Sequence, residues 1–162
     1  MLGVTRLLFV CTGNICRSPT AEAVARETAI RLGASDQFEF DSAGIEGYHV
    51  GEPPDRRAIA RGRLRGYDLS PLRARRVTSH DFEQFDLILA MDREHFDALE
   101  RRCPPALQHK VQMFLSRAAN GPDVDVPDPY YGTDEDFDVV LDMCEDVVPQ
   151  WLAELNGPPT TV

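Results

Sequence analysis

The stretch Leu7–Val24, LLFVCTGNICRSPTAEAV, joins an apolar run to a helical pattern through a short polar loop. Residues 5–10 are typical of a central strand that is buried on both faces of a parallel sheet. From Pro19 to about Leu32, small and apolar residues recur at helical spacing, and the proline suits a first helical turn. A strand, a tight loop and a helix in this order predict the opening unit of an α/β fold.

The rest of the chain continues this alternation of short apolar strands and helical patterns. Further strands are expected at 38–44, 85–92 and 109–115, and further helices at 54–67, 93–101 and 134–155. The alternation predicts an α/β protein, a three-layer α/β/α sandwich around a four-stranded parallel sheet of the flavodoxin-like order 2-1-3-4. We expect one domain over residues 1–155 and a flexible C-terminal tail at 156–162.

Composition narrows the class of protein and its partners. The 162 residues carry a formal net charge of −10, which disfavours nucleic acid as a partner. No apolar run approaches the ~20 residues of a membrane span, and no segment resembles a signal peptide. The four cysteines are too few and too scattered for a disulfide framework, and they lack the paired spacing of a zinc site. We therefore expect a cytoplasmic protein with reduced thiols.

The charge is unevenly spread along the chain. Residues 56–76 hold eight arginines and one acid, whereas residues 123–146 hold ten acids and no lysine or arginine. One interpretation of both runs is solvated surface. The other is that the arginines form a basic rim for acidic partner proteins.

The loop between the first strand and the first helix combines features that bind an anion. Gly13 and Asn14 both tolerate a positive φ, so consecutive backbone N–H groups can turn inward. The loop leads into the positive end of a helix, and Arg17 adds a planar fork for two phosphate oxygens. The same field favours the thiolate form of Cys11. One loop can therefore gather a tetrahedral dianion and present a nucleophile to it.

Other interpretations of this loop are weaker. The G-x-x-x-x-G-K-[ST] pattern of nucleotide-binding loops and the G-x-G-x-x-G dinucleotide pattern are both absent from the sequence. A cysteine at the end of a strand is often only a small buried hydrophobe, but here Gly13-Asn14, a Ser-Pro pair and a helix accompany it. The fold would suit an FMN carrier, although a loop with a cysteine and an arginine is a poor flavin cradle.

The segment Val10–Pro19, VCTGNICRSP, resembles the signature of the low-molecular-weight protein tyrosine phosphatases. SAG at 42–44, AMD at 90–92 and DPYYG at 128–132 resemble that family at matching places, so the resemblance covers about residues 5–155. It implies a protein-tyrosine-phosphatase, a phosphoric monoester hydrolase that acts through a phosphocysteine intermediate. It also implies a reaction without metal or cofactor, because an arginine and backbone amides stabilise the charge.

The resemblance implies roles for individual residues as well. Cys11 resembles the nucleophile, Arg17 the arginine that clamps phosphate, and Asp128 the general acid and base. Ser18 resembles the hydroxyl that steadies the departing sulfur. The residues implied in phosphate binding are Thr12, Gly13, Asn14, Ile15, Cys16, Arg17 and Ser18.

Further residues of the resemblance surround this loop. Asn14, Ser42 and Asp92 resemble supports of the loop, with a substrate contact as the alternative for Asp92. The family often places a histidine in this network, where alignment puts Leu72. Cys16 resembles the redox partner that protects the nucleophile through a reversible disulfide, with loop packing as the alternative.

Three tyrosines resemble the walls around an aromatic substrate, namely Tyr48, Tyr130 and Tyr131. For Tyr48, simple packing is the alternative. The partners that the resemblance implies are phosphotyrosine proteins, among which a tyrosine kinase of the same cell is a candidate. We expect a monomer or a weak dimer.

Functions related to this one are the main alternatives. A thioredoxin-coupled arsenate reductase resembles this fold and loop, but it needs two further cysteines close together, whereas Cys103 and Cys144 are far apart. A protein arginine phosphatase typically has threonine where Ile15 stands, and it lacks the tyrosine pair. A phosphotyrosine-binding module without turnover would not need the nucleophile, the arginine and the acid together. The histidines are unclustered and are predicted to lie on the surface, at His49, His80, His95 and His109.

Overall fold

The computed structural model describes residues 3–118 and 124–156, and its centre is a parallel sheet of four strands. The strands are β1 (Thr5–Cys11), β2 (Phe38–Gly44), β3 (Leu87–Ala90) and β4 (Val111–Met113). Their order is β2-β1-β3-β4 and each neighbouring pair is parallel, which confirms the predicted sheet. The tail predicted at 156–162 lies, apart from Asn156, outside the described residues.

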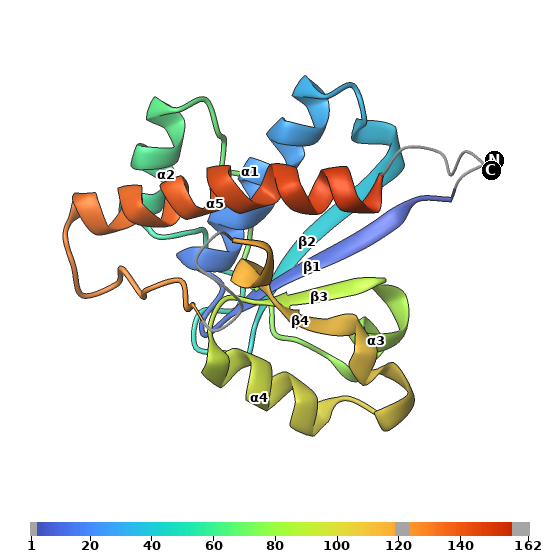
Figure 1. Cartoon of the computed structure of the whole chain (residues 1–162). Coiled ribbons are helices and arrows are strands. Elements are labelled where there is room, and N and C mark those ends of the chain that lie inside the picture. The colour runs from blue at the N-terminus through green and yellow to red at the C-terminus, as the bar shows by residue number, and fades with distance from the viewer. Residues whose placement is uncertain (1–2, 119–123, 157–162) are drawn as a thin grey trace.

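Helices cover both faces of this sheet. They are α1 (Arg17–Arg31), α2 (Arg56–Leu64), α3 (Ser79–Gln84), α4 (Arg93–Arg102) and α5 (Asp134–Leu155), with 3-10 turns η1 (Ser35–Gln37), η2 (Pro105–Lys110) and η3 (Phe114–Arg117). Figure 1 shows α1, α2 and α5 above the sheet and α3 and α4 below it. The predicted three-layer sandwich is therefore confirmed, and two hydrophobic clusters fill the two spaces between the layers.

The apolar run of β1 is continuous because the strand is central. Leu7 and Phe9 belong to the cluster under α1 and α5, whereas Leu8 and Val10 belong to the cluster over α3 and α4. Side chains alternate between the faces of a strand, so a strand covered on both sides needs apolar residues at every position. All four side chains are almost completely buried.

The prediction of the helices needs correction in two places. Helix α1 begins at Arg17, two residues before Pro19. The proline is tolerated there because the first four N–H groups of a helix have no partner within it. Leu32, which was expected on the apolar side, follows the end of the helix and is exposed. The short helix α3 was not predicted, although Thr78 and Asp81 form a capping box at its start.

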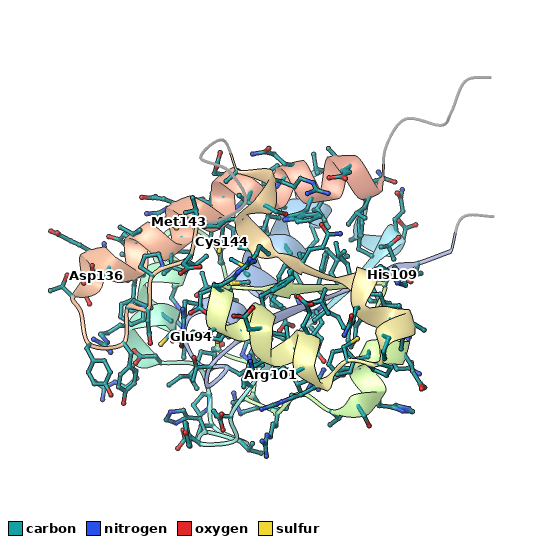
Figure 2. All side chains as sticks on the ribbon, turned by 60° about the horizontal axis from the view of Figure 1, so that its bottom comes forward. Glu94, Arg101, His109, Asp136, Met143 and Cys144 are labelled. Atoms are coloured by element: carbon teal, nitrogen blue, oxygen red, sulfur yellow. The ribbon has the colours of Figure 1, made fainter. Side chains whose placement is uncertain are left out.

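The two charged runs of the sequence lie side by side in the fold, because α2 packs against α5. Arg61 of α2 and Arg65, the residue that follows α2, each lie 2.8 Å from a carboxylate of α5, those of Asp138 and Asp142. Figure 2 shows the acidic Asp136 at the start of α5 and Cys144 further along the same helix. Because these arginines pair within the chain, the structure favours solvated surface over a free basic rim as the interpretation of the two runs.

The C-terminal half of α5 is held by one buried aromatic residue. The Trp151 indole N–H donates a hydrogen bond to the backbone carbonyl of Phe114 at 2.8 Å, and the ring is almost completely buried. The Arg117 guanidinium covers the ring from outside, 4.5 Å from its centroid. This contact ties α5 to the segment that follows β4.

We predict that Trp151→Ala lowers the free energy of unfolding by about 3–5 kcal/mol, because it leaves a large cavity and a buried carbonyl without its donor. By contrast, Arg65→Ala should cost less than about 1 kcal/mol, because partly exposed ion pairs are screened by solvent. Urea denaturation of both variants measures the difference. Equal losses would contradict the assignment of Trp151 to the core.

Candidate active site

The loop between β1 and α1 turns sharply within residues 12–16. Asn14 has a φ of 60°, and in the described ranges it is the sole residue other than glycine with a positive φ. Gly13 does not use the positive φ that its sequence allowed. Its role is spatial, because a Cβ there would lie 2.9 Å from the His49 ring. The chain can therefore reverse direction between the strand and the helix with one left-handed residue.

Gly44 explains why a glycine ends β2 beside this loop. It pairs with Cys11 in the sheet, and a Cβ on it would lie 2.8 Å from the Thr12 carbonyl oxygen and 3.1 Å from the Gly13 carbonyl carbon. These are backbone atoms that cannot move aside without moving the loop. The SAG segment thus provides the close approach on which the shape of the loop depends.

Asn14 anchors the loop through all of its amide group. Its Nδ2 donates to the hydroxyls of Ser18 at 2.8 Å and Ser42 at 2.9 Å, and its Oδ1 accepts from the backbone N–H of Arg75 at 3.0 Å. Leu72, which the alignment placed at the family's histidine, forms none of these hydrogen bonds. Two of the three predicted supports, Asn14 and Ser42, therefore meet in the structure, and Arg75 supplies a bond from the segment where the family often has a histidine.

Sequence reasoning missed the acid that ends this network. The Ser42 hydroxyl donates to the buried carboxylate of Glu22 at 2.7 Å, and Arg26 donates to the other oxygen of that carboxylate at 2.7 Å. Burial raises the pKa of Glu22, and these two hydrogen bonds oppose the rise. The available signal was a glutamate among small residues on the first helix. The acid makes Ser42 a donor, so the Ser42 oxygen is free to accept from Asn14.

Cys11 and Ser18 lie side by side at the end of this chain of hydrogen bonds. The Cys11 sulfur is 3.0 Å from the Ser18 hydroxyl oxygen, and both residues are buried. Because the Ser18 oxygen already accepts from the Asn14 amide, its hydrogen is free to point at the sulfur. No acidic side chain occupies the first turn of α1, which the structure describes in full. The Ser18 hydroxyl is therefore placed to donate a hydrogen bond to the sulfur.

Arg17 is buried and held from two sides. Its Nη1 donates to Asp92 at 2.8 Å and to the backbone carbonyl of Val126 at 3.0 Å. Its Nη2 lies 3.8 Å from the Asp128 carboxylate. Asp92 also caps α4, because it accepts from the N–H of His95. The guanidinium is thus fixed in orientation before any anion binds, which reduces the entropy that binding would cost.

His95 is part of this arrangement, and the prediction that it lies on the surface is wrong. Its ring is buried, with Nε2 2.8 Å from the Thr12 hydroxyl and 3.5 Å from Arg17. Its Nδ1 lies 3.1 Å from Asp92 but without the alignment of a hydrogen bond. The signal in the sequence was the Asp92-x-x-His95 spacing, because the third residue of a helix lies beside the residue that caps its N-terminus.

The environment of His95 keeps the ring neutral. Burial, and then the neighbouring charge of Arg17, lower the pKa of His95 from its ordinary value of 6.5 to about 4. Asp92 and Asp128 act in the opposite direction and only partly compensate. A neutral ring can accept from the Thr12 hydroxyl at Nε2, which leaves the Thr12 oxygen free to accept from Arg17 at 3.4 Å.

A cavity of about 270 Å³ opens above the loop, and it gathers residues from three segments of the chain. Its lining is Cys11, Thr12, Gly13, Ile15, Cys16, Arg17, Tyr48, His49, Asp128, Tyr130 and Tyr131. Asp128 is half-exposed, and one of its oxygens accepts from the Tyr130 backbone N–H at 3.1 Å. The tyrosines line the outer part of the cavity, and Tyr48 and Tyr131 are strongly exposed. The histidine that lines it, His49, was not predicted.

Cys16 lies in the same loop as a buried thiol. Burial raises the pKa of Cys16, and the charges of Asp55 and Cys11 raise it further. Cys16 is therefore a thiol at neutral pH and a poor nucleophile. Its redox role stays a prediction.

Comparison with known proteins gives one consistent result. The family model described as low molecular weight phosphotyrosine protein phosphatase matches residues 6–158. The chain belongs to this family. A low molecular weight protein-tyrosine-phosphatase of Streptomyces coelicolor is 44% identical over 143 residues, which are 86% of this chain and 87% of that protein. The low molecular weight phosphotyrosine protein phosphatase of Homo sapiens is 39% identical over 139 residues, covering 85% and 87%.

Solved structures of low molecular weight phosphatases share the fold as well as the sequence. A crystal structure of a protein tyrosine phosphatase from Entamoeba histolytica matches with a TM-score of 0.90 and 38% identity, covering 94% of this chain and 97% of that one. The chain is thus a protein-tyrosine phosphatase, and Cys11 and Arg17 are placed as in the active-site motif. None of the helices in the described part of the chain is both long and apolar enough to cross a membrane.

We predict that the neutral His95 makes folding sensitive to acid. The unfolded chain takes up this proton near pH 6.5, whereas the folded phosphatase takes it up only near pH 4. The contribution of His95 to stability is therefore complete above about pH 6.5 and is lost as the pH falls toward 4. In His95→Asn, the free energy of unfolding should fall less steeply over this window than in the unsubstituted protein.

The measurement is urea denaturation at several pH values between 4 and 7. His80→Asn is the matched control, because His80 is exposed. The control should keep the slope of the unsubstituted protein. A slope in His95→Asn equal to that of the control would contradict the prediction.

Proposed function

We propose that this phosphatase hydrolyses phosphotyrosine in two steps, through a phosphocysteine at Cys11. The observation that carries the proposal is the 3.0 Å contact between the Cys11 sulfur and the Ser18 hydroxyl, in a cavity that Arg17 and Asp128 also line. A nucleophile, a cation for the phosphate and a proton carrier are the groups that this reaction needs.

In the first step, the Cys11 thiolate attacks phosphorus as the bond to the phenolic oxygen breaks. Arg17 and the amides of residues 12–18 bind the phosphoryl oxygens, whose charge spreads over them in the transition state. Asp128, as the acid, gives its proton to the departing phenolic oxygen. The products are phosphocysteine and the free tyrosine hydroxyl.

In the second step, water replaces the phenol. The Asp128 carboxylate takes a proton from the water as the water oxygen attacks phosphorus, and the bond between phosphorus and sulfur breaks. The electron pair of that bond returns to Cys11 as thiolate. The Ser18 hydroxyl, which the Asn14 amide orients, donates to the departing sulfur and lowers the cost of its charge. Inorganic phosphate then leaves.

The residues around the cavity suit an aromatic substrate. Tyr48, Tyr130 and Tyr131 supply flat surfaces at its rim, and the apolar Ile15 lies in its lining. Ile15 offers no hydrogen-bond partner to a phosphorylated guanidinium, which favours phosphotyrosine over phosphoarginine. Arsenate reduction is disfavoured because Cys103 and Cys144, the two remaining cysteines, are both buried, at the end of α4 and within α5.

The proposal also covers the substrates, the cellular compartment and the oligomeric state of the phosphatase. Its substrates would be phosphotyrosine proteins, with a tyrosine kinase as one candidate, and its role would be in signalling. The four cysteines are free thiols, which suits a reducing compartment such as the cytoplasm. We also propose a monomer or a weak dimer, which sedimentation analysis would test.

We predict that Cys11→Ser abolishes hydrolysis of p-nitrophenyl phosphate and phosphotyrosine, because a serine hydroxyl is not ionised near neutral pH. Asp128→Asn should lower kcat/KM for phosphotyrosine by about 10²–10⁴-fold, the usual contribution of a general acid. Steady-state kinetics and acid quenching with radiolabelled substrate measure the rates and the phosphoenzyme. Appreciable turnover by Cys11→Ser would reject the covalent mechanism, and faster hydrolysis of phosphoarginine would favour the alternative substrate.

A further inference from the structure

The segment that carries Asp128 has no regular secondary structure, so other residues must hold its position. Residues 124–129 form neither helix nor strand, and a turn follows at Tyr130. On the N-terminal side, the buried Val126 donates its N–H to the Met91 carbonyl at 2.9 Å, and its carbonyl accepts from Arg17. Figure 1 shows the described part of this segment, in orange, passing beside the end of the sheet where β1 ends.

Arg57 holds the C-terminal side of the same segment. From the first turn of α2, its Nη2 donates to the Tyr130 carbonyl at 2.7 Å and its Nη1 donates to the Gly132 carbonyl at 3.1 Å. Its guanidinium lies 5.9 Å from the Tyr130 ring centroid and 4.6 Å from that of Phe137. Since the Tyr130 N–H donates to Asp128 while the Tyr130 carbonyl accepts from Arg57, a single residue separates Arg57 from the carboxylate.

Arg57 is itself fixed to the phosphate-binding loop through Asp55. The Asp55 carboxylate accepts from Arg57 Nε at 3.1 Å and from Nη2 at 3.1 Å. The Asp55 backbone N–H donates to the Ile15 carbonyl at 2.8 Å. Although partial burial opposes ionisation, the hydrogen bonds from Arg57 hold the pKa of Asp55 below its ordinary value. The two residues thus connect the loop of Cys11 with the segment of Asp128.

We propose that Arg57 is a positioning residue that sets the distance between Asp128 and the phosphate-binding loop, and hence the transfer of the proton to the leaving group. The inference rests on the proposed role of Asp128 as the general acid. Arg57 does not line the cavity, so it acts through Asp128 rather than on the substrate. A small misplacement of a reacting group lowers rates strongly even where the fold is intact.

Arg61 offers a matched control on the same helix. Its Nε and Nη2 donate to the two oxygens of Asp138 at 2.9 and 2.8 Å, so Arg61, like Arg57, makes a bidentate ion pair with a carboxylate. The side chains of Arg57 and Arg61 are exposed to a similar extent, 35% and 32%. Arg61 ties α2 to α5 without a bond to the segment of Asp128. Loss of either arginine removes one partly exposed ion pair, which rarely unfolds a protein.

The test compares two aryl phosphates that differ in their need for a proton. The nitrophenolate of p-nitrophenyl phosphate leaves readily without one, whereas the phenol of phenyl phosphate does not. We expect Arg57→Gln to lower kcat/KM for phenyl phosphate at least ~10-fold more than for p-nitrophenyl phosphate, which is a part of the general-acid contribution. Arg61→Gln should change both values by less than about twofold. Both substrates carry an aryl ring, so an altered Tyr130 contact largely cancels in the ratio.

Two further variants make the outcome decisive. Arg57→Lys keeps the charge but loses the planar fork, and it should give a ratio between those of the unsubstituted protein and Arg57→Gln. Adding Arg57→Gln to Asp128→Asn should not change the ratio further, because the two residues act through the same proton.

The results also separate this inference from the proposed function. The ratio compared is that of kcat/KM for the two aryl phosphates. The role of Arg57 alone would be overturned if this ratio were strongly altered in Asp128→Asn but unchanged in Arg57→Gln, or if Arg57→Gln and Arg61→Gln gave the same ratio. An unaltered ratio in Asp128→Asn would overturn the proposed general acid and this inference with it.

Discussion

The structure depends on the five residues that separate the end of β1 at Cys11 from the start of α1 at Arg17. In that space the chain must leave the centre of the sheet, reverse direction and begin a helix with its N–H groups facing the same point. One left-handed residue, Asn14, makes this possible, and the hydrogen bonds of its amide prevent the loop from relaxing. The cysteine and the arginine owe their mutual placement to this turn.

The polar groups beneath the loop form a continuous chain of hydrogen bonds. The chain begins at the ion pair between the exposed Arg26 and the buried Glu22, and it passes through the hydroxyl of Ser42 to Asn14. Asn14 donates to the hydroxyls of both Ser42 and Ser18, so the Ser18 hydroxyl is left to donate to sulfur. A buried polar network that is fully satisfied gives rigidity as well as direction. Here the network holds the Ser18 hydroxyl in place beside the Cys11 sulfur.

Arginines serve three different purposes in this molecule. Arg17 is buried and faces the cavity, Arg57 joins two loops, and Arg61 with Arg65 ties one surface helix to another. The sequence marks Arg17 by its loop, but it shows Arg57, Arg61 and Arg65 as members of one basic stretch, with no sign of which partner each one finds. For most of these bonds, the partner lies more than 70 residues away along the sequence. The partners of Arg57, Arg61 and Arg65 are therefore decided only when α2 packs against α5 and against residues 124–133.

The sequence by itself determined the layers, the strand order and the meeting of Cys11, Arg17 and Ser18, because alternating patterns and a short loop are local features that the chain cannot satisfy in another way. It did not determine the buried places of Glu22 and His95 or the contacts of Arg57. The identity of a titratable residue in the sequence does not reveal whether its side chain faces water or the interior. Its environment is decided by segments distant in sequence, and those are brought together only when the helices pack on the sheet.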